Sequence, residues 1–284
     1  MIVAGLVLDG GGMKGVYTAG VLDFFLDKNL EFKNVYGVSA GACTMCSYIS
    51  KQRGRAKETF VDYVGEKGYM GLHSLLTTGD IFNVGMSYHL VPDYLNPFDY
   101  ETYKSFEGNA YAVVTNIETG EAEYIKIKDM HEGMDYIRAS SSLPLVSRNV
   151  RIGDNLYLDG GIADSIPIKR SEADGNAKNV VILTKPVGYR RKPEGKKSLA
   201  AIKVRYLNYP KVYELMENRC DAYNDTMEYL EKEAAQGKIF LLQPEEDFEI
   251  DRLEKDKEKL QALYEEGYKE AESKYEALME YLNK

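Results

Sequence analysis

One serine, set in a short motif rich in small residues, is well suited to nucleophilic chemistry. Ser39 lies within residues 37–41, Gly-Val-Ser-Ala-Gly, after the apolar pair 35–36 and before a helical pattern. Strand, sharp turn and helix are the setting of a nucleophile elbow, which exposes the hydroxyl and directs the amides of the helix N-terminus towards it. Such a strained turn needs neighbours without bulk, and Gly37 and Gly41 fit this need. The motif alone also fits a tight turn that carries an incidental serine.

A glycine-rich loop near the N-terminus offers backbone amides to an anion. Gly10, Gly11 and Gly12 follow an apolar run and precede a helical pattern. An oxyanion hole needs such amides, and losing one donor costs about 2.7–4 kcal/mol of transition-state stabilisation. Together with Gly15, the loop also satisfies the dinucleotide fingerprint, but no acidic residue follows the second strand to hold a ribose. A nucleotide- or anion-binding protein that uses the Gly10–Gly15 loop is the alternative function.

The serine needs a base, and the histidines are poorly placed to provide it. The chain has only His73, His89 and His131, whereas α/β-hydrolases carry their triad in the order Ser, acid, His. We therefore expect the histidines in the core or on the surface. Asp159, which precedes two glycines, is the remaining candidate, because even a weak base assists when it is desolvated and hydrogen-bonded to the hydroxyl. An Asp-Gly turn without a catalytic part is the alternative for this residue.

Length and composition predict a globular protein with a core. The chain has 284 residues, 44% of them hydrophobic, and its net charge of −9 argues against a nucleic-acid partner.

Three cysteines fit a reducing compartment better than a disulfide framework. Cys43 and Cys46 have the spacing of a metal-binding pair, but nothing nearby completes a site, so we expect both in the core. We expect no metal and no cofactor.

The N-terminal residues and the apolar segments predict the location of the protein. The first residues lack the basic region of a signal peptide. No segment approaches the roughly 20 apolar residues that a membrane span needs. We expect a soluble, cytoplasmic protein. The sequence allows transient contact with a membrane surface and does not predict the oligomeric state.

The first elements must bring the serine and the glycine loop together. Residues 2–8 predict a buried strand, 16–26 a helix, 35–38 a second strand and 41–53 a second helix. This order predicts right-handed crossovers and a parallel sheet covered by helices. The loops that follow the two strands then emerge at the same edge of the sheet.

Later segments add further elements to this sheet. The patterns predict hairpins over 110–127 and 150–158, a helix over 131–139, and other elements further along the chain. These others are a strand over 180–183, a helix from Pro210 to near Gly237, a strand over 239–242 that returns to the sheet, and an amphipathic helix in the tail, docked on the core.

Two stretches lack clear periodicity. Residues 66–106 are rich in aromatic residues and predict either irregular packing or a lid or pocket wall around the serine. Residues 188–198 carry a run of charges that predicts a solvated loop. We expect a catalytic domain over 1–198 and a mainly helical extension over 199–284, packed on the same core.

Three motifs, taken together, resemble the motif blocks of patatin-like phospholipases. They are residues 9–15 (Asp-Gly-Gly-Gly-Met-Lys-Gly), 37–41, and 159–161 (Asp-Gly-Gly). Residues 138–144 (Arg-Ala-Ser-Ser-Ser-Leu-Pro) are similar to the segment that precedes the aspartate motif in bacterial members. The resemblance spans roughly residues 3–190.

The resemblance implies a fold and a mechanism. The fold would be a three-layer α/β/α sandwich with a mainly parallel central sheet and a helical C-terminal extension. Ser39 would be the nucleophile and Asp159 the base of a dyad without histidine, with the amides of Gly10, Gly11 and Gly12 as the oxyanion hole. The substrate would be a lipid or another acyl ester. Many members carry Arg at the position of Lys14 and Ala at that of Gly161, and both are small departures from the family's motifs.

Overall fold

A single sheet forms the middle of the molecule, whose computed structural model describes residues 1–66 and 68–284. The strand order is β5-β6-β3-β2-β1-β7-β8, and β4 pairs with β3. Strands β3, β2, β1, β7 and β8 run parallel, whereas β4, β5 and β6 form antiparallel pairs. The strands are β1 Ile2–Leu8, β2 Phe32–Val38, β3 Asn109–Asn116, β4 Ala122–Lys126, β5 Val150–Ile152, β6 Asn155–Asp159, β7 Asn179–Ile182 and β8 Ile239–Leu242.

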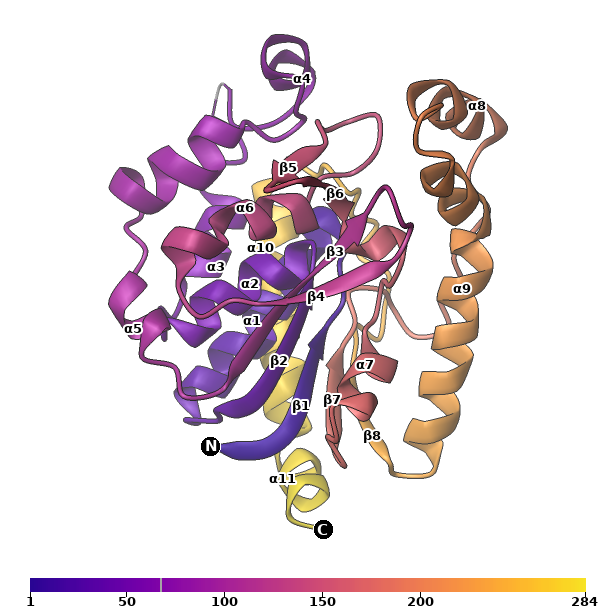
Figure 1. Cartoon of the computed structure of the whole chain (residues 1–284). Coiled ribbons are helices and arrows are strands. Elements are labelled where there is room, and N and C mark those ends of the chain that lie inside the picture. The colour runs from indigo at the N-terminus through magenta and orange to yellow at the C-terminus, as the bar shows by residue number, and fades with distance from the viewer. Residues whose placement is uncertain (67) are drawn as a thin grey trace.

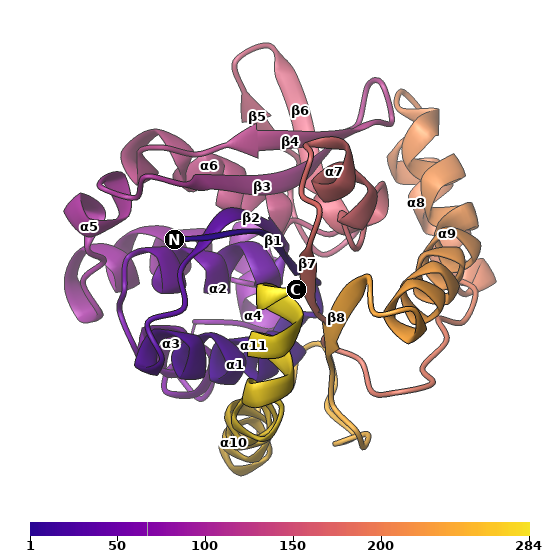
Figure 2. The ribbon, with the colours of Figure 1, turned by 90° about the horizontal axis from the view of Figure 1, so that it is seen from below.

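Helices cover both faces of this sheet, so the predicted three-layer architecture is confirmed (Figures 1 and 2). In β1, Leu6 and Leu8 face the core beneath one layer of helices and Val7 faces the other. The first layer holds α1 Gly15–Asp27, α2 Ala40–Ile49, α3 Arg55–Val61, α6 Met130–Ser140 and α10 Lys257–Ser273. The second holds α7 Ile168–Ala173, α8 Lys196–Arg205 and α9 Pro210–Ala235. Further helices are η1 Gly12–Lys14, α4 Leu72–Thr78, η2 Met86–Leu95, α5 Tyr100–Lys104, η3 Gly160–Ile162 and α11 Tyr275–Asn283.

Most of the predicted elements are confirmed, and three differ. The helix predicted over 41–53 ends at Ile49, because Lys51 (φ 55°) and Gly54 (φ 83°) turn the chain before α3 begins. The tail forms two helices that meet at Lys274 rather than one. The stretch 66–106 is not irregular, since it holds α4, η2 and α5.

The C-terminal residues contribute to the same sheet and the same helical layer. Strand β8 extends the sheet next to β7, as predicted, and α10 packs along α1. The two helices approach closely because each has a glycine at the contact, Gly20 in α1 and Gly267 in α10. The Tyr17 hydroxyl donates a hydrogen bond of 2.8 Å to Glu270 across this contact. The division of the chain at residue 198 stays a prediction.

The helices of the described residues give no candidate for a membrane span. Each one is either too short or too polar to cross a bilayer.

Candidate active site

Ser39 occupies the strained turn that its motif predicts. Its φ of 55° and ψ of −120° lie outside the common regions, between the end of β2 and the start of α2. The flanking glycines make room for close backbone packing. A Cβ on Gly37 would stand 2.6 Å from Cα of Ala42, and one on Gly41 would stand 2.5 Å from the carbonyl oxygen of Leu8. Any larger residue at either position would push the elbow away from the sheet.

The loop after α6 connects the serine with the aspartate. The Ser39 amide donates a hydrogen bond of 2.8 Å to Oγ of Ser140. Two residues later, the Ser142 carbonyl accepts a hydrogen bond of 2.8 Å from the Asp159 amide. The Asp159 carbonyl in turn accepts a 2.8 Å bond from the Thr115 hydroxyl of β3. Three hydrogen bonds from two segments, residues 140–142 and strand β3, therefore hold the two residues in place.

Asp159 is a buried carboxyl group at the end of β6. Its side chain accepts a hydrogen bond of 2.7 Å from the Gly161 amide, and the Ser39 side chain lies close enough to lower its pKa. Burial raises the pKa of Asp159 above its ordinary value, and the charge of Arg219 opposes this shift most strongly. A carboxylate with a raised pKa is a stronger base, so this environment suits proton transfer from the serine.

The glycine loop lies directly against the serine. A Cβ on Gly10 would stand 3.0 Å from Cβ of Ser39, and Gly12 has a positive φ of 59°. Among the hydrogen bonds of the described residues, none uses the amides of Gly10, Gly11 or Gly12, whereas the next amide, of Met13, bonds the Arg252 carbonyl at 3.1 Å. Unpaired amides beside the serine are what an oxyanion hole requires.

The other residues with candidate chemistry lie away from the dyad or are inert. His73, His89 and His131 are exposed, and His131 stacks on Tyr100 with 4.1 Å between ring centroids. Cys46 is buried, as expected for the core. Cys43 differs in part, because it lines a cavity beside the serine, where burial raises the pKa of its thiol.

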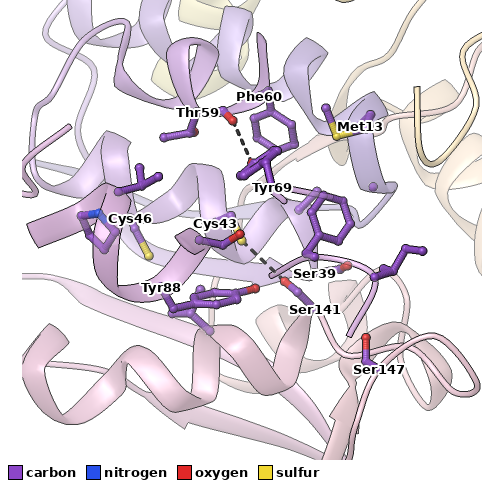
Figure 3. A pocket seen from close by; sticks show the side chains of 18 of the residues that line it. Met13, Ser39, Cys43, Cys46, Thr59, Phe60, Tyr69, Tyr88, Ser141 and Ser147 are labelled. Atoms are coloured by element: carbon purple, nitrogen blue, oxygen red, sulfur yellow. Dashed lines mark hydrogen bonds between the residues drawn. The ribbon is translucent and has the colours of Figure 1, made fainter. Parts of the chain in front are cut away.

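A mainly apolar cavity of about 320 Å³ opens beside Ser39. Figure 3 shows Phe60, Tyr69, Tyr88 and Cys43 around it, with Ser39 at one side. Helix η2 and the loops on both sides of α4 supply part of its wall, so the pocket-wall interpretation of residues 66–106 is confirmed. The volume is typical of sites that bury a small molecule or an acyl chain.

Four cations that the sequence analysis did not select lie on the other side of Ser39. A second pocket, of about 30 Å³, is lined by the dyad, the glycine loop and the side chains Lys185, Arg191, Arg219 and Arg252. The prediction of a solvated loop over 188–198 is therefore wrong for Arg191. No local pattern marks these residues in a chain with 36 lysines and arginines, because three separate segments bring them together.

Two family models match this chain. The model described as patatin-like phospholipase matches residues 6–170, which is more than half of the chain. A second model, described as a domain of unknown function, matches residues 209–283.

Individual relatives cover different shares of the chain. The uncharacterized protein YjjU of Escherichia coli is 27% identical over 246 residues, which are 84% of this chain and 68% of that protein. The lysophospholipase NTE1 of Yarrowia lipolytica is 28% identical over 181 residues, 60% of this chain but only 12% of that protein. Among solved structures, VipD from Legionella pneumophila aligns with 99% of this chain and 66% of its own, at 13% identity and a TM-score of 0.49.

Proposed function

This chain belongs to the patatin-like phospholipase family, and on that premise we propose that it is a serine acyl hydrolase that cleaves carboxylic ester bonds of lipids through a dyad of Ser39 and Asp159. The observation that carries the proposal is the placement of three groups at one point. A serine on a strained elbow, a buried carboxylate whose pKa the serine side chain lowers and the unpaired glycine amides line one pocket.

The proposed reaction has two half-reactions. Oγ of Ser39 attacks the ester carbonyl carbon while Asp159 takes the hydroxyl proton, and the negative charge on the carbonyl oxygen is stabilised by the amides of Gly10, Gly11 and Gly12. The C–O bond to the alcohol breaks, and the alcohol leaves with the proton from Asp159. Water then attacks the acyl-enzyme and gives a proton to Asp159. The bond between the acyl carbon and Oγ of Ser39 breaks, Asp159 returns the proton to Oγ, and the carboxylic acid is released.

The apolar cavity supports an acyl chain as the group on the carbonyl side. Its lining includes Phe60, Tyr69, Tyr88 and Val91, which offer contact area and few hydrogen-bond partners. The buried thiol of Cys43 lies in the same wall, where its raised pKa keeps it in the neutral, unreactive form.

A lipid surface is the proposed source of the substrate. The segment that lines the cavity also presents exposed apolar side chains, among them Leu72 and Leu76 on α4 and Tyr94 on η2. Exposed apolar groups next to an acyl-chain cavity suit transient contact with a membrane. The cytoplasmic location stays a prediction from the sequence.

The alternative, a nucleotide- or anion-binding protein that uses the Gly10–Gly15 loop, predicts different behaviour. Such a protein would be stabilised by NAD or ATP in a thermal shift assay and would not react with an electrophile directed at serine. The acidic residue that would hold a ribose after β2 is missing, which disfavours this alternative.

A fluorophosphonate probe and p-nitrophenyl acyl esters test the proposed function. The wild type should be labelled at Ser39 and should hydrolyse the esters, and Ser39→Ala should lose both properties, because the nucleophile is gone. Ser198→Ala, which changes a serine of α8 far from the dyad, is the matched control and should retain both. Full ester hydrolysis by Ser39→Ala would refute the proposal.

A further inference from the structure

The second pocket beside Ser39 has an unusual concentration of positive charge. Its four cations, Lys185, Arg191, Arg219 and Arg252, face two buried carboxylates, Asp9 and Asp159. The chain as a whole carries a net charge of −9. We refer to this site as the cationic pocket.

The charges of Asp9 and Asp159 act on the four cations, but only from beyond ion-pair distance. Among the described residues, none of the four forms an ion pair with a carboxylate, although eleven pairs occur elsewhere. Lys185 is only 7% exposed, and its Nζ contacts Oγ1 of Thr184 at 3.2 Å. Four cations against two carboxylates leave a net positive charge in this pocket, and such a pocket suits an anionic ligand.

The arginines are held in place by contacts that leave donors free. Nε of Arg219 donates a 2.6 Å hydrogen bond to the Gly161 carbonyl, and the guanidinium of Arg191 lies 4.3 Å from the ring centre of Tyr223. Nε of Arg191 is buried without a hydrogen-bond partner in the described structure. A guanidinium has five N–H donors, so pre-positioned arginines of this kind suit binding of a phosphate or carboxylate.

Ser39 lies where the two pockets meet. It lines both of them, as do Gly12, Leu143 and Arg252. One side is apolar and has a volume of about 320 Å³, and the other is cationic and has about 30 Å³. An ester carbonyl at Ser39 would therefore have its acyl chain on the apolar side and its alcohol part on the cationic side.

We infer that the cationic pocket binds an anionic group, a phosphate or a carboxylate, on the alcohol side of the ester that Ser39 cleaves. This inference rests on the proposed function and narrows its substrate class from lipid esters to anionic lipid esters. The four residues all follow residue 170, where the match to the family ends, and Arg219 and Arg252 lie within 209–283. The C-terminal region thus supplies a specificity site to the catalytic residues.

Two substrates that differ only in a phosphate test this inference. Decanoyl lysophosphatidic acid and decanoyl monoacylglycerol share the acyl chain and the ester, so the ratio of their kcat/KM values reports recognition of the anion. The wild type should prefer the lysophosphatidic acid, and Arg191→Gln/Arg252→Gln should lower the ratio tenfold or more. These two positions are chosen because Arg252 holds the glycine loop through its backbone, which the substitution keeps. The side chains of Arg219 and Lys185, in contrast, hydrogen-bond the Gly161 carbonyl and Thr184. Arg205→Gln, an exposed arginine of α8, is the matched control and should keep the wild-type ratio.

Binding to the Ser39→Ala protein separates this inference from the proposed function, because it requires no turnover. That protein should bind the lysophosphatidic acid at least tenfold more tightly than the monoacylglycerol, and the two arginine substitutions should remove the difference. Equal binding of both lipids, or a ratio unchanged by the substitutions, would overturn the inference while ester hydrolysis still supports the dyad. Inorganic phosphate that binds as tightly as the lysophosphatidic acid would overturn it as well, since the pocket would then serve a free anion.

Discussion

At the scale of single residues, the proposed mechanism depends on the environment of Asp159, which would take the part that a histidine has in a Ser-His-Asp triad. Asp159 is 2% exposed, its side chain accepts a hydrogen bond from the Gly161 amide, and the Ser39 side chain lies close enough to lower its pKa. Burial disfavours its charge more than these contacts and Arg219 favour it, so its pKa is raised. Once ionised, Asp159 is therefore a stronger base than an exposed aspartate, as the proposed dyad requires.

This environment predicts the pH dependence of catalysis. Since Asp159 acts as a base only when ionised, kcat/KM should fall as the pH drops through its raised pKa, at a pH above the ordinary value of 3.8. Asp159→Asn should lower kcat/KM about 10²–10⁴-fold and remove this acidic limb, because the amide takes up no proton. Asp154→Asn, an exposed aspartate in the turn between β5 and β6, should keep the wild-type profile. A stopped assay on p-nitrophenyl esters across the acidic range measures both effects, and an unchanged limb in Asp159→Asn would contradict the assignment.

At the scale of elements, the sequence predicted what is local and missed what depends on distant contacts. The glycine loop, the elbow and the aspartate turn are short motifs next to strands, so their residues could be chosen directly. Helix α3 and the helices of residues 66–106 lack long apolar periodicity, because they pack around a cavity and not on a flat sheet. The role of Ser140 could not be predicted, since its bond to the Ser39 amide joins residues 101 positions apart.

The contact between α1 and α10 gives a prediction in which two effects oppose each other. Alanine normally stabilises an exposed helix by about 1 kcal/mol relative to glycine. A Cβ on Gly267 would collide with the backbone carbonyl of Tyr17, so Gly267→Ala should instead lower the free energy of unfolding by about 1–3 kcal/mol. Gly195→Ala, where no atom lies within 4 Å of the new Cβ, should be neutral within about 0.5 kcal/mol. Urea denaturation followed by circular dichroism measures both free energies of unfolding. A Gly267→Ala variant as stable as the wild type would show that α1 and α10 can move apart without losing stability.

At the scale of the whole molecule, two stretches matched by different family models meet at one site. The part matched by the patatin-like model supplies Ser39, Asp159 and the glycine loop, and the four cations of the pocket come from later residues, with Arg219 and Arg252 inside the second match. Arg252 belongs to both pockets, and its carbonyl accepts the Met13 amide that follows the glycine loop. The C-terminal residues therefore take part in shaping the site, which no motif within residues 1–198 could have predicted.

The position of exposed leucines relative to the sheet predicts how the molecule meets its substrate. Leu72 and Leu76, on α4, are 68% and 77% exposed, and Figure 1 places α4 beyond the end of the sheet to which the parallel strands run. Inserting a leucine into lipid gains about 1.5–3 kcal/mol, so Leu72→Glu/Leu76→Glu should lower vesicle binding at least tenfold. The rate on phospholipid vesicles should fall with it, relative to the rate on a water-soluble ester. Val3→Glu is the matched control, since Val3 is 77% exposed at the opposite end of the sheet, near the N-terminus. Vesicle co-sedimentation measures the binding. If Val3→Glu weakens vesicle binding as much as Leu72→Glu/Leu76→Glu does, the added negative charge explains the effect and α4 is not the contact surface.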